Sequence, residues 1–187
     1  MNYHDFIWDL GGTLLDNYEM STTAFVATLK DFHIQANHDS VYAALKISTQ
    51  DAIATFAPHV SDFRTAYKKK EAIALQEPVL FDGAKELLEE IQLQGGRHFL
   101  VSHRDRQVLT LIDQTGIASF FTEIVTADEG FPRKPDPASM LYLKEKYGIQ
   151  DGLVIGDRPI DIEAGEAAGL STYLFDSMPH LRQFIFE

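Results

Sequence analysis

The chain has 187 residues, of which 45% are apolar, and it contains no cysteine. This length suits one domain, or a core with a modest insertion, and the apolar content is sufficient to fill a core. The formal charge of −12, from 16 basic and 28 acidic side chains, argues against nucleic acid and anionic membranes as partners. The lack of cysteine excludes disulfides and thiol chemistry, and it is compatible with a cytoplasmic location. The first nine residues include Asp5 and only a short apolar run, so we expect neither a signal peptide nor a transmembrane helix.

The first expected element is a short buried strand, Phe6–Trp8, which ends at Asp9. The run that follows, Asp9-Leu10-Gly11-Gly12-Thr13, places glycines where the chain must turn sharply. A carboxylate at the end of a strand is well placed to attack an electrophile or to hold a metal ion.

The next segment, from Asp16 to about Glu77, has a helical pattern with no convincing strand, and Pro78 ends it. We expect Ser21 to cap its first helix, and Ser40 and Ser61 to precede two others. The segment interrupts the chain after its first strand. It therefore indicates an inserted, all-helical domain at residues 16–78.

From Asp82 onward, helices and short apolar strands alternate. Such alternation predicts an α/β fold, with a parallel sheet covered by helices on both faces. We therefore expect a Rossmann-like, three-layer core formed by residues 1–15 and 79–187. The expected strands are 98–102, 123–126, 153–155 and 172–175, and the expected helices are 82–94, 108–115, 136–147 and 162–168.

Polar side chains follow four of these strands. Ligands of doubly wound sheets bind beyond the carboxyl ends of the strands, so these side chains should gather at one edge. A carboxylate nucleophile there could form an aspartyl-phosphate, carboxylates could hold Mg²⁺, and an ammonium could neutralise phosphoryl oxygens. The residues at these ends are Asp9, Ser102, Lys134, Asp157 and Asp161.

This pattern resembles the haloacid dehalogenase superfamily of hydrolases over essentially the whole chain. The family's first motif, Asp-x-Asp-Gly-Thr, corresponds to Asp9-Leu10-Gly11-Gly12-Thr13. Its later motifs correspond to Phe99-Leu100-Val101-Ser102, to Arg133-Lys134-Pro135, and to Gly156-Asp157 with Asp161. The layout is most similar to the phosphoglycolate phosphatase-like and β-phosphoglucomutase-like branch, which carries a small helical cap.

The resemblance implies a Mg²⁺-dependent phosphatase that acts on a small phosphorylated metabolite. Its catalytic residues would be Asp9 as the nucleophile, Ser102 and Lys134. No sequence feature indicates an oligomeric state. The resemblance also implies substrate contacts from Gly12, Thr13, Ser102, His103, Lys134 and Arg158, and Mg²⁺ ligands from Asp9, the Gly11 backbone carbonyl, Asp157 and Asp161.

The chain departs from the family at Gly11, where phosphatases of the family carry an aspartate. That aspartate protonates the leaving group and activates water, so its loss should slow the reaction by about 10²–10⁴-fold unless another group replaces it. His103 and Asp16 are candidate replacements. Two alternatives stay open. One is an impaired protein that binds a phospholigand in a regulatory role. The other is a hydrolase of a phosphonate or carbon–halogen bond. Phosphonate hydrolysis would need a lysine from the helical segment that forms a Schiff base.

Overall fold

The computed structural model describes all residues from 1 to 187. They form two compact units, one of Met1–Leu15 with Leu80–Glu187 and the other of Asp16–Val79. None of the helices combines the length and the apolar character that crossing a membrane requires. The first unit is called the core unit below, and the second the helical unit.

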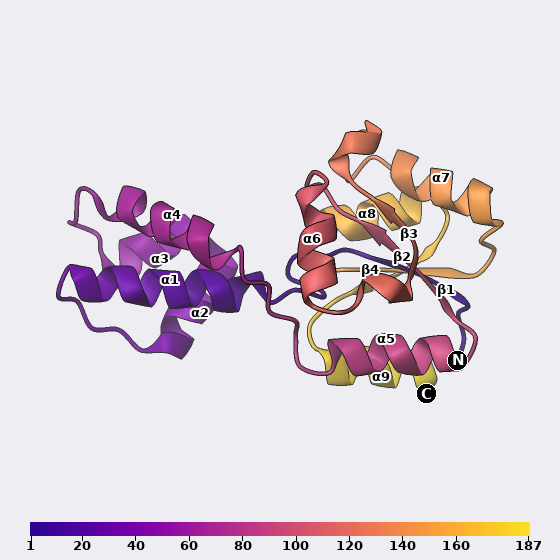
Figure 1. The fold of residues 1–187 in the computed structure, drawn as a ribbon, viewed down its shortest axis with the longest axis horizontal. Coiled ribbons are helices and arrows are strands. Elements are labelled where there is room, and N and C mark those ends of the chain that lie inside the picture. Colours follow the sequence, from indigo (N-terminus) through magenta and orange to yellow (C-terminus); the bar gives the residue numbers. More distant parts are fainter. The chain divides into compact units, whose positions relative to one another are not determined.

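The core unit contains one five-stranded sheet, in which all neighbouring strands are parallel (Figure 1). Its order, β3-β2-β1-β4-β5, puts the first strand at the centre. After β3 the chain crosses to the other side of β1, where it forms β4 and β5. This arrangement confirms the expected α/β fold. The strands are β1 (Asp5–Trp8), β2 (Arg97–Val101), β3 (Phe121–Val125), β4 (Gly152–Gly156) and β5 (Ser171–Leu174).

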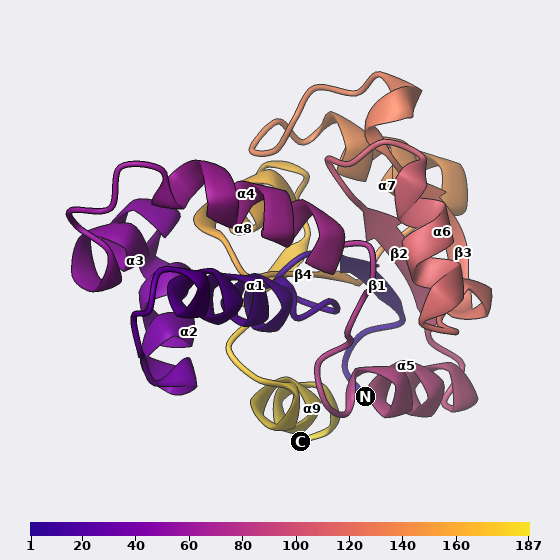
Figure 2. The same cartoon turned by 60° about the vertical axis from the view of Figure 1, so that its left-hand side comes forward.

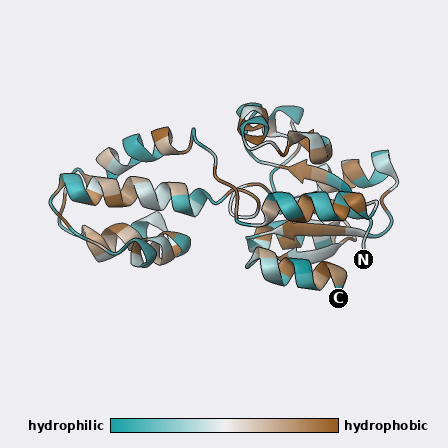
Figure 3. Ribbon diagram, turned by 60° about the horizontal axis from the view of Figure 1, so that its bottom comes forward, coloured by the Kyte–Doolittle hydropathy of each residue, from teal (hydrophilic) through white to brown (hydrophobic).

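Helices cover both faces of this sheet because alternate residues of each strand point to opposite sides. On β1, Phe6 and Trp8 join one buried cluster, whereas Ile7 joins the other. Figure 3 shows hydrophobic strands beside helices of mixed hydropathy. One face is covered by α5 (Ala84–Leu93), α6 (Gln107–Gln114) and α9 (Met178–Phe186), and the other by α7 (Ala138–Tyr147) and α8 (Pro159–Ala167). Short 3₁₀ turns lie at Ala118–Phe120 and Ala127–Glu129.

The helical unit has its own aromatic core. The ring of Phe25 lies 4.8 Å from that of Phe63 and 4.9 Å from that of Tyr67, in edge-on contacts. The first helix packs against both the second and the fourth (Figure 2). The four helices are α1 (Asn17–Asp31), α2 (His38–Ile47), α3 (Thr49–Phe56) and α4 (Phe63–Ala74).

Several helices begin elsewhere than the sequence suggests. Ser21 lies inside α1, and Asp16 caps that helix by accepting a hydrogen bond from the Glu19 N–H at 3.0 Å. Asp82 is not a cap either, because Gly83 occupies the N-cap position of α5. The prediction also lacked α9, although Ser177 caps it as a serine before an apolar run should.

Candidate active site

The turn after β1 holds Asp9 at the centre of the sheet edge. Its backbone N–H donates to the Ile155 carbonyl of β4 at 2.8 Å, and its side chain is buried. The left-handed backbone of the turn falls at Gly12, with φ of +85°. A Cβ at Gly12 would lie 2.3 Å from Asp157 Oδ2, so this glycine lets the turn approach the end of β4 closely.

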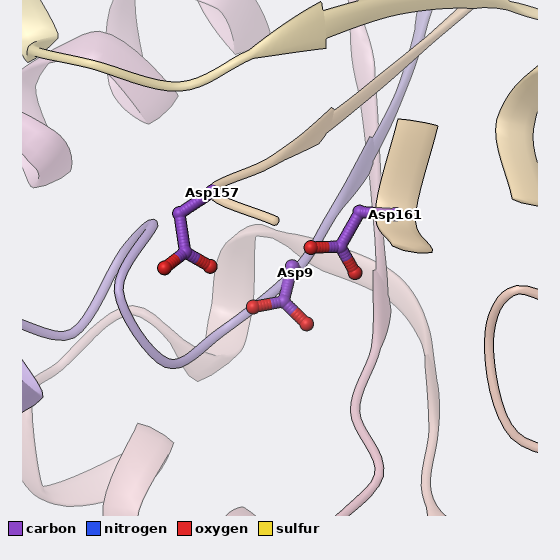
Figure 4. Close-up of side chains that lie close together, drawn as sticks. All are labelled: Asp9, Asp157 and Asp161. Carbon is purple, nitrogen blue, oxygen red and sulfur yellow. The ribbon is translucent and has the colours of Figure 1, made fainter. Parts of the chain in front are cut away.

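Three carboxylates converge at this point (Figure 4). One oxygen from each of Asp9, Asp157 and Asp161 lies within 4.8 Å of the others. Asp157 follows β4, and Asp161 lies in the first turn of α8, where it accepts the Arg158 N–H at 3.1 Å. Gly156 makes room for this helix, since a Cβ there would lie 2.3 Å from that of Asp161. A purely structural role for Asp157 as the helix cap does not apply, because Arg158 occupies the N-cap position.

Lys134 enters the cluster from the loop after β3, and its side chain is buried. Its Nζ donates to Asp9 Oδ1 at 2.5 Å and to the Val101 carbonyl at 3.3 Å. Nζ also lies 2.5 Å from Asp161 Oδ1, an ion pair outside hydrogen-bond geometry. The lysine therefore joins two of the three carboxylates through one ammonium.

One ammonium does not balance three carboxylates. Burial, the largest effect, raises the pKa of Asp9 against the opposing charge of Lys134. Burial, followed by repulsion from Asp9 and Asp161, raises the pKa of Asp157 to about 6. A cation among these oxygens would relieve that repulsion, and hard oxygens are the ligands that Mg²⁺ prefers. The donor set therefore fits the expected metal.

Ser102 follows β2 at the same edge, and its N–H donates to the Val125 carbonyl at 2.9 Å. His103 comes next, and its Nε2 accepts the backbone N–H of Lys134 at 2.8 Å. Burial, then the charges of Lys134 and Arg133, lowers the pKa of His103 to about 4. A neutral ring that already accepts a hydrogen bond from a backbone N–H is poorly suited to replace the aspartate that the family carries at position 11. It is instead well placed to hold the lysine segment.

The other predicted residues have different surroundings. The Thr13 hydroxyl is buried without a hydrogen-bond partner, which leaves it available to a ligand. Arg158 is exposed, and its charge acts on both Asp9 and Asp157. Gly11 lies in the turn and forms a bridge with Leu15. Asp16 belongs to the helical unit, where it accepts hydrogen bonds from the Glu19 N–H and, at 3.1 Å, from the Tyr42 hydroxyl.

Sequence reasoning missed Arg133. Its Nε lies 3.4 Å from His103 Nδ1, beside the predicted residues. The available signal was its position directly before Lys134, in a loop that follows a strand.

Curated relatives match parts of the chain. A phosphoglycolate phosphatase of Pseudomonas putida is 32% identical over 111 residues, which cover 58% of this chain and 39% of that protein. The chain thus spans about two fifths of the length of the phosphoglycolate phosphatases that it matches. Pyrophosphatase PpaX of Oceanobacillus iheyensis is 25% identical over 184 residues, which cover 92% of this chain and 83% of that protein.

Solved structures extend the similarity to the whole chain. The crystal structure of a hydrolase from Streptococcus pneumoniae TIGR4 matches with a TM-score of 0.94 and 63% identity, over 99% of each chain. A predicted phosphoglycolate phosphatase from Haemophilus somnus shares the fold, with a TM-score of 0.63 and 23% identity over 92% of this chain and 84% of that one. The model of the haloacid dehalogenase-like hydrolase family matches residues 6–175, so the chain belongs to that family.

Proposed function

We propose that the protein is a Mg²⁺-dependent phosphatase of small phosphate esters that uses Asp9 as its nucleophile. The observation that carries this proposal is the buried cluster in which Asp9 meets Lys134, Asp157 and Asp161 at the carboxyl edge of the sheet. The phosphoglycolate phosphatases and the pyrophosphatase among the relatives support a small phosphorylated substrate.

In the proposed reaction, a carboxylate oxygen of Asp9 attacks phosphorus, and the bond from phosphorus to the leaving oxygen breaks. The product is an aspartyl-phosphate, and the leaving oxygen takes its proton from solvent. Water then attacks phosphorus, which releases inorganic phosphate and restores the Asp9 carboxylate. The Lys134 ammonium stabilises negative charge on the phosphoryl oxygens in both steps, and Ser102 donates a hydrogen bond to one of them.

The Mg²⁺ ligands in this proposal are Asp9, Asp157, Asp161 and the backbone carbonyl of Gly11. The ion would supply charge neutralisation for the phosphoryl group when it is bound. Gly12, Thr13, His103 and Arg158 are proposed to line the substrate site. We assign the helical unit the role of a cap, as its place in the chain directly after the first motif suggests.

Replacing Asp9 with asparagine tests the proposal. Purified protein with Mg²⁺ should release phosphate from a panel of small phosphate esters, and Asp9→Asn should lower kcat by at least about 10³-fold. Asp5→Asn is the matched control, because Asp5 lies at the other end of β1 and pairs there with Arg97. No release by the wild type, or equal rates for the wild type and Asp9→Asn, would overturn the proposal.

Gly11 favours a second candidate, a protein that keeps the site for a phospholigand but no longer turns it over. This candidate predicts binding of phosphate esters by calorimetry with no phosphate release. A phosphoryl group found on Asp9 after incubation with a substrate would exclude it.

A further inference from the structure

Arginine is concentrated at the carboxyl edge of the sheet, despite the acidic composition. Four of the seven arginines, Arg104, Arg106, Arg133 and Arg158, lie in loops that follow β2, β3 and β4. Away from this edge, Arg97 and Arg182 form ion pairs with Asp5 and Glu90. By contrast, no carboxylate pairs with Arg133 or Arg158, and both are exposed. Two positive charges next to the proposed phosphoryl site are therefore available to a ligand.

Two donors face each other beside this site. The Lys134 N–H points at His103 Nε2, so the proton of the neutral ring lies on Nδ1. That Nδ1–H faces Arg133 Nε at 3.4 Å, and a guanidinium nitrogen is always a donor. Neither group can accept from the other. An anionic oxygen that contacts both groups from the side would accept from each of them.

A cavity of about 150 Å³ lies next to this donor pair within the core unit. Its lining includes Ser102, His103 and Arg133, together with apolar side chains such as Val125 and Phe131. The volume is several times the roughly 30 Å³ that one water molecule occupies, so a carboxylate or a phosphate group fits. The Glu129 carboxylate accepts from the Thr126 N–H and hydroxyl, both at 2.6 Å, and it forms no ion pair with Arg133.

We propose that this cavity binds a second anionic group of the substrate, held by the Nδ1–H of His103 and the guanidinium of Arg133. The inference rests on the proposed function, because Ser102 places the cavity directly beside the phosphoryl site. It narrows the substrate class to small esters or anhydrides that carry a carboxylate or a second phosphate a few bonds from the scissile phosphorus. Arg158 adds positive charge to the same region, since its charge acts on the His103 ring.

Binding without turnover tests this inference. Calorimetric titrations of Asp9→Asn in MgCl₂ would compare inorganic phosphate with 2-phosphoglycolate and with pyrophosphate. A charge-assisted contact to arginine should make the ligands with two anionic groups bind at least about tenfold more tightly than phosphate. The carboxylate and the diphosphate ligand then identify which second group the cavity prefers.

Variants of the second site complete the test. In the Asp9→Asn background, Arg133→Gln should abolish the preference, so that all three ligands bind with about equal affinity. Arg133→Lys should retain part of the preference. Arg106→Gln is the matched control, because it removes the same charge from the same edge, but Arg106 pairs with Asp128. Equal affinity for all three ligands, or a preference that survives Arg133→Gln, would overturn the inference. The proposed function is judged separately, by phosphate release from the wild type.

Discussion

Two consecutive residues at the end of β1 bury polar groups in opposite ways. The Trp8 indole N–H donates to His98 Nδ1 at 3.0 Å, and His98 Nε2 bonds to the Leu88 carbonyl at 3.0 Å. Every polar atom of this pair is satisfied by another part of the core. Asp9, one residue later, lies among carboxylates that a single ammonium does not neutralise. The contrast separates a structural polar network from a candidate ligand site, where the buried charges are not balanced.

The largest effect on turnover is expected from Gly11→Asp, which alters the carboxylate cluster around Asp9 and leaves the Trp8–His98 network unchanged. With substrates whose leaving group is poor, the variant should turn over about 10²–10⁴-fold faster, since it restores the acid and base that the family uses. Steady-state kcat with Mg²⁺ measures this change. Gly11→Asn is the matched control, because it adds similar volume without a titratable group and should bring no such gain. An unchanged rate in both variants would mean that the site lacks more than this one group.

The satisfied network predicts an effect on stability and none on chemistry. Burial lowers the pKa of His98 to about 4, against 6.5 for the unperturbed group. Only the unfolded chain therefore gains this proton between about pH 6.5 and pH 4. The stabilisation is complete above pH 6.5, and about 3 kcal/mol is lost as the pH falls to 4.

Chemical denaturation across this pH range measures that loss. His98→Gln keeps a donor and an acceptor but does not titrate, so its free energy of unfolding should fall less steeply with acid. Parallel curves for the two proteins would mean that His98 is not held neutral in the folded state.

The smallest effect concerns metal and pH at the acidic cluster. Burial, followed by repulsion from Asp9 and Asp161, raises the pKa of Asp157 to about 6, so ionisation of this carboxyl destabilises the fold as the pH rises from about 4 to about 6. Mg²⁺ should offset this repulsion at pH above 7, whereas protonation should compete with the metal near pH 5. We expect MgCl₂ at 100 times its Kd to stabilise the fold by about 2.7 kcal/mol near pH 7.5, and by about 1.4 kcal/mol less near pH 5.

Thermal unfolding with MgCl₂, against NaCl of equal ionic strength, measures this difference. Asp157→Asn should lose most of the stabilisation and its dependence on pH. Equal stabilisation of the wild type and the variant would place the metal elsewhere.

The sequence predicted the fold and the positions at which the strands end, because short apolar runs stop abruptly at polar residues such as Asp9 and Asp157. A parallel sheet brings such ends together by its topology alone. The contacts between distant residues could not be predicted in this way. The pairing of Lys134 with Asp161 depends on the path of a loop, and the pairing of Trp8 with His98 joins residues 90 positions apart. The sequence signal for α9 is Ser177, a serine directly before an apolar run, which caps the helix.

The proposed reaction depends on a covalent bond between Asp9 and phosphorus. A substrate with a good leaving group, p-nitrophenyl phosphate, needs no acid to depart, whereas Gly11 leaves the second step without a base to activate water. The intermediate should therefore accumulate. Rapid mixing with Mg²⁺ should give a burst of nitrophenol equal to the enzyme concentration, and acid-quenched protein should carry one phosphoryl group on Asp9. Turnover with no burst and no phosphoryl group on Asp9 would exclude Asp9 as the nucleophile.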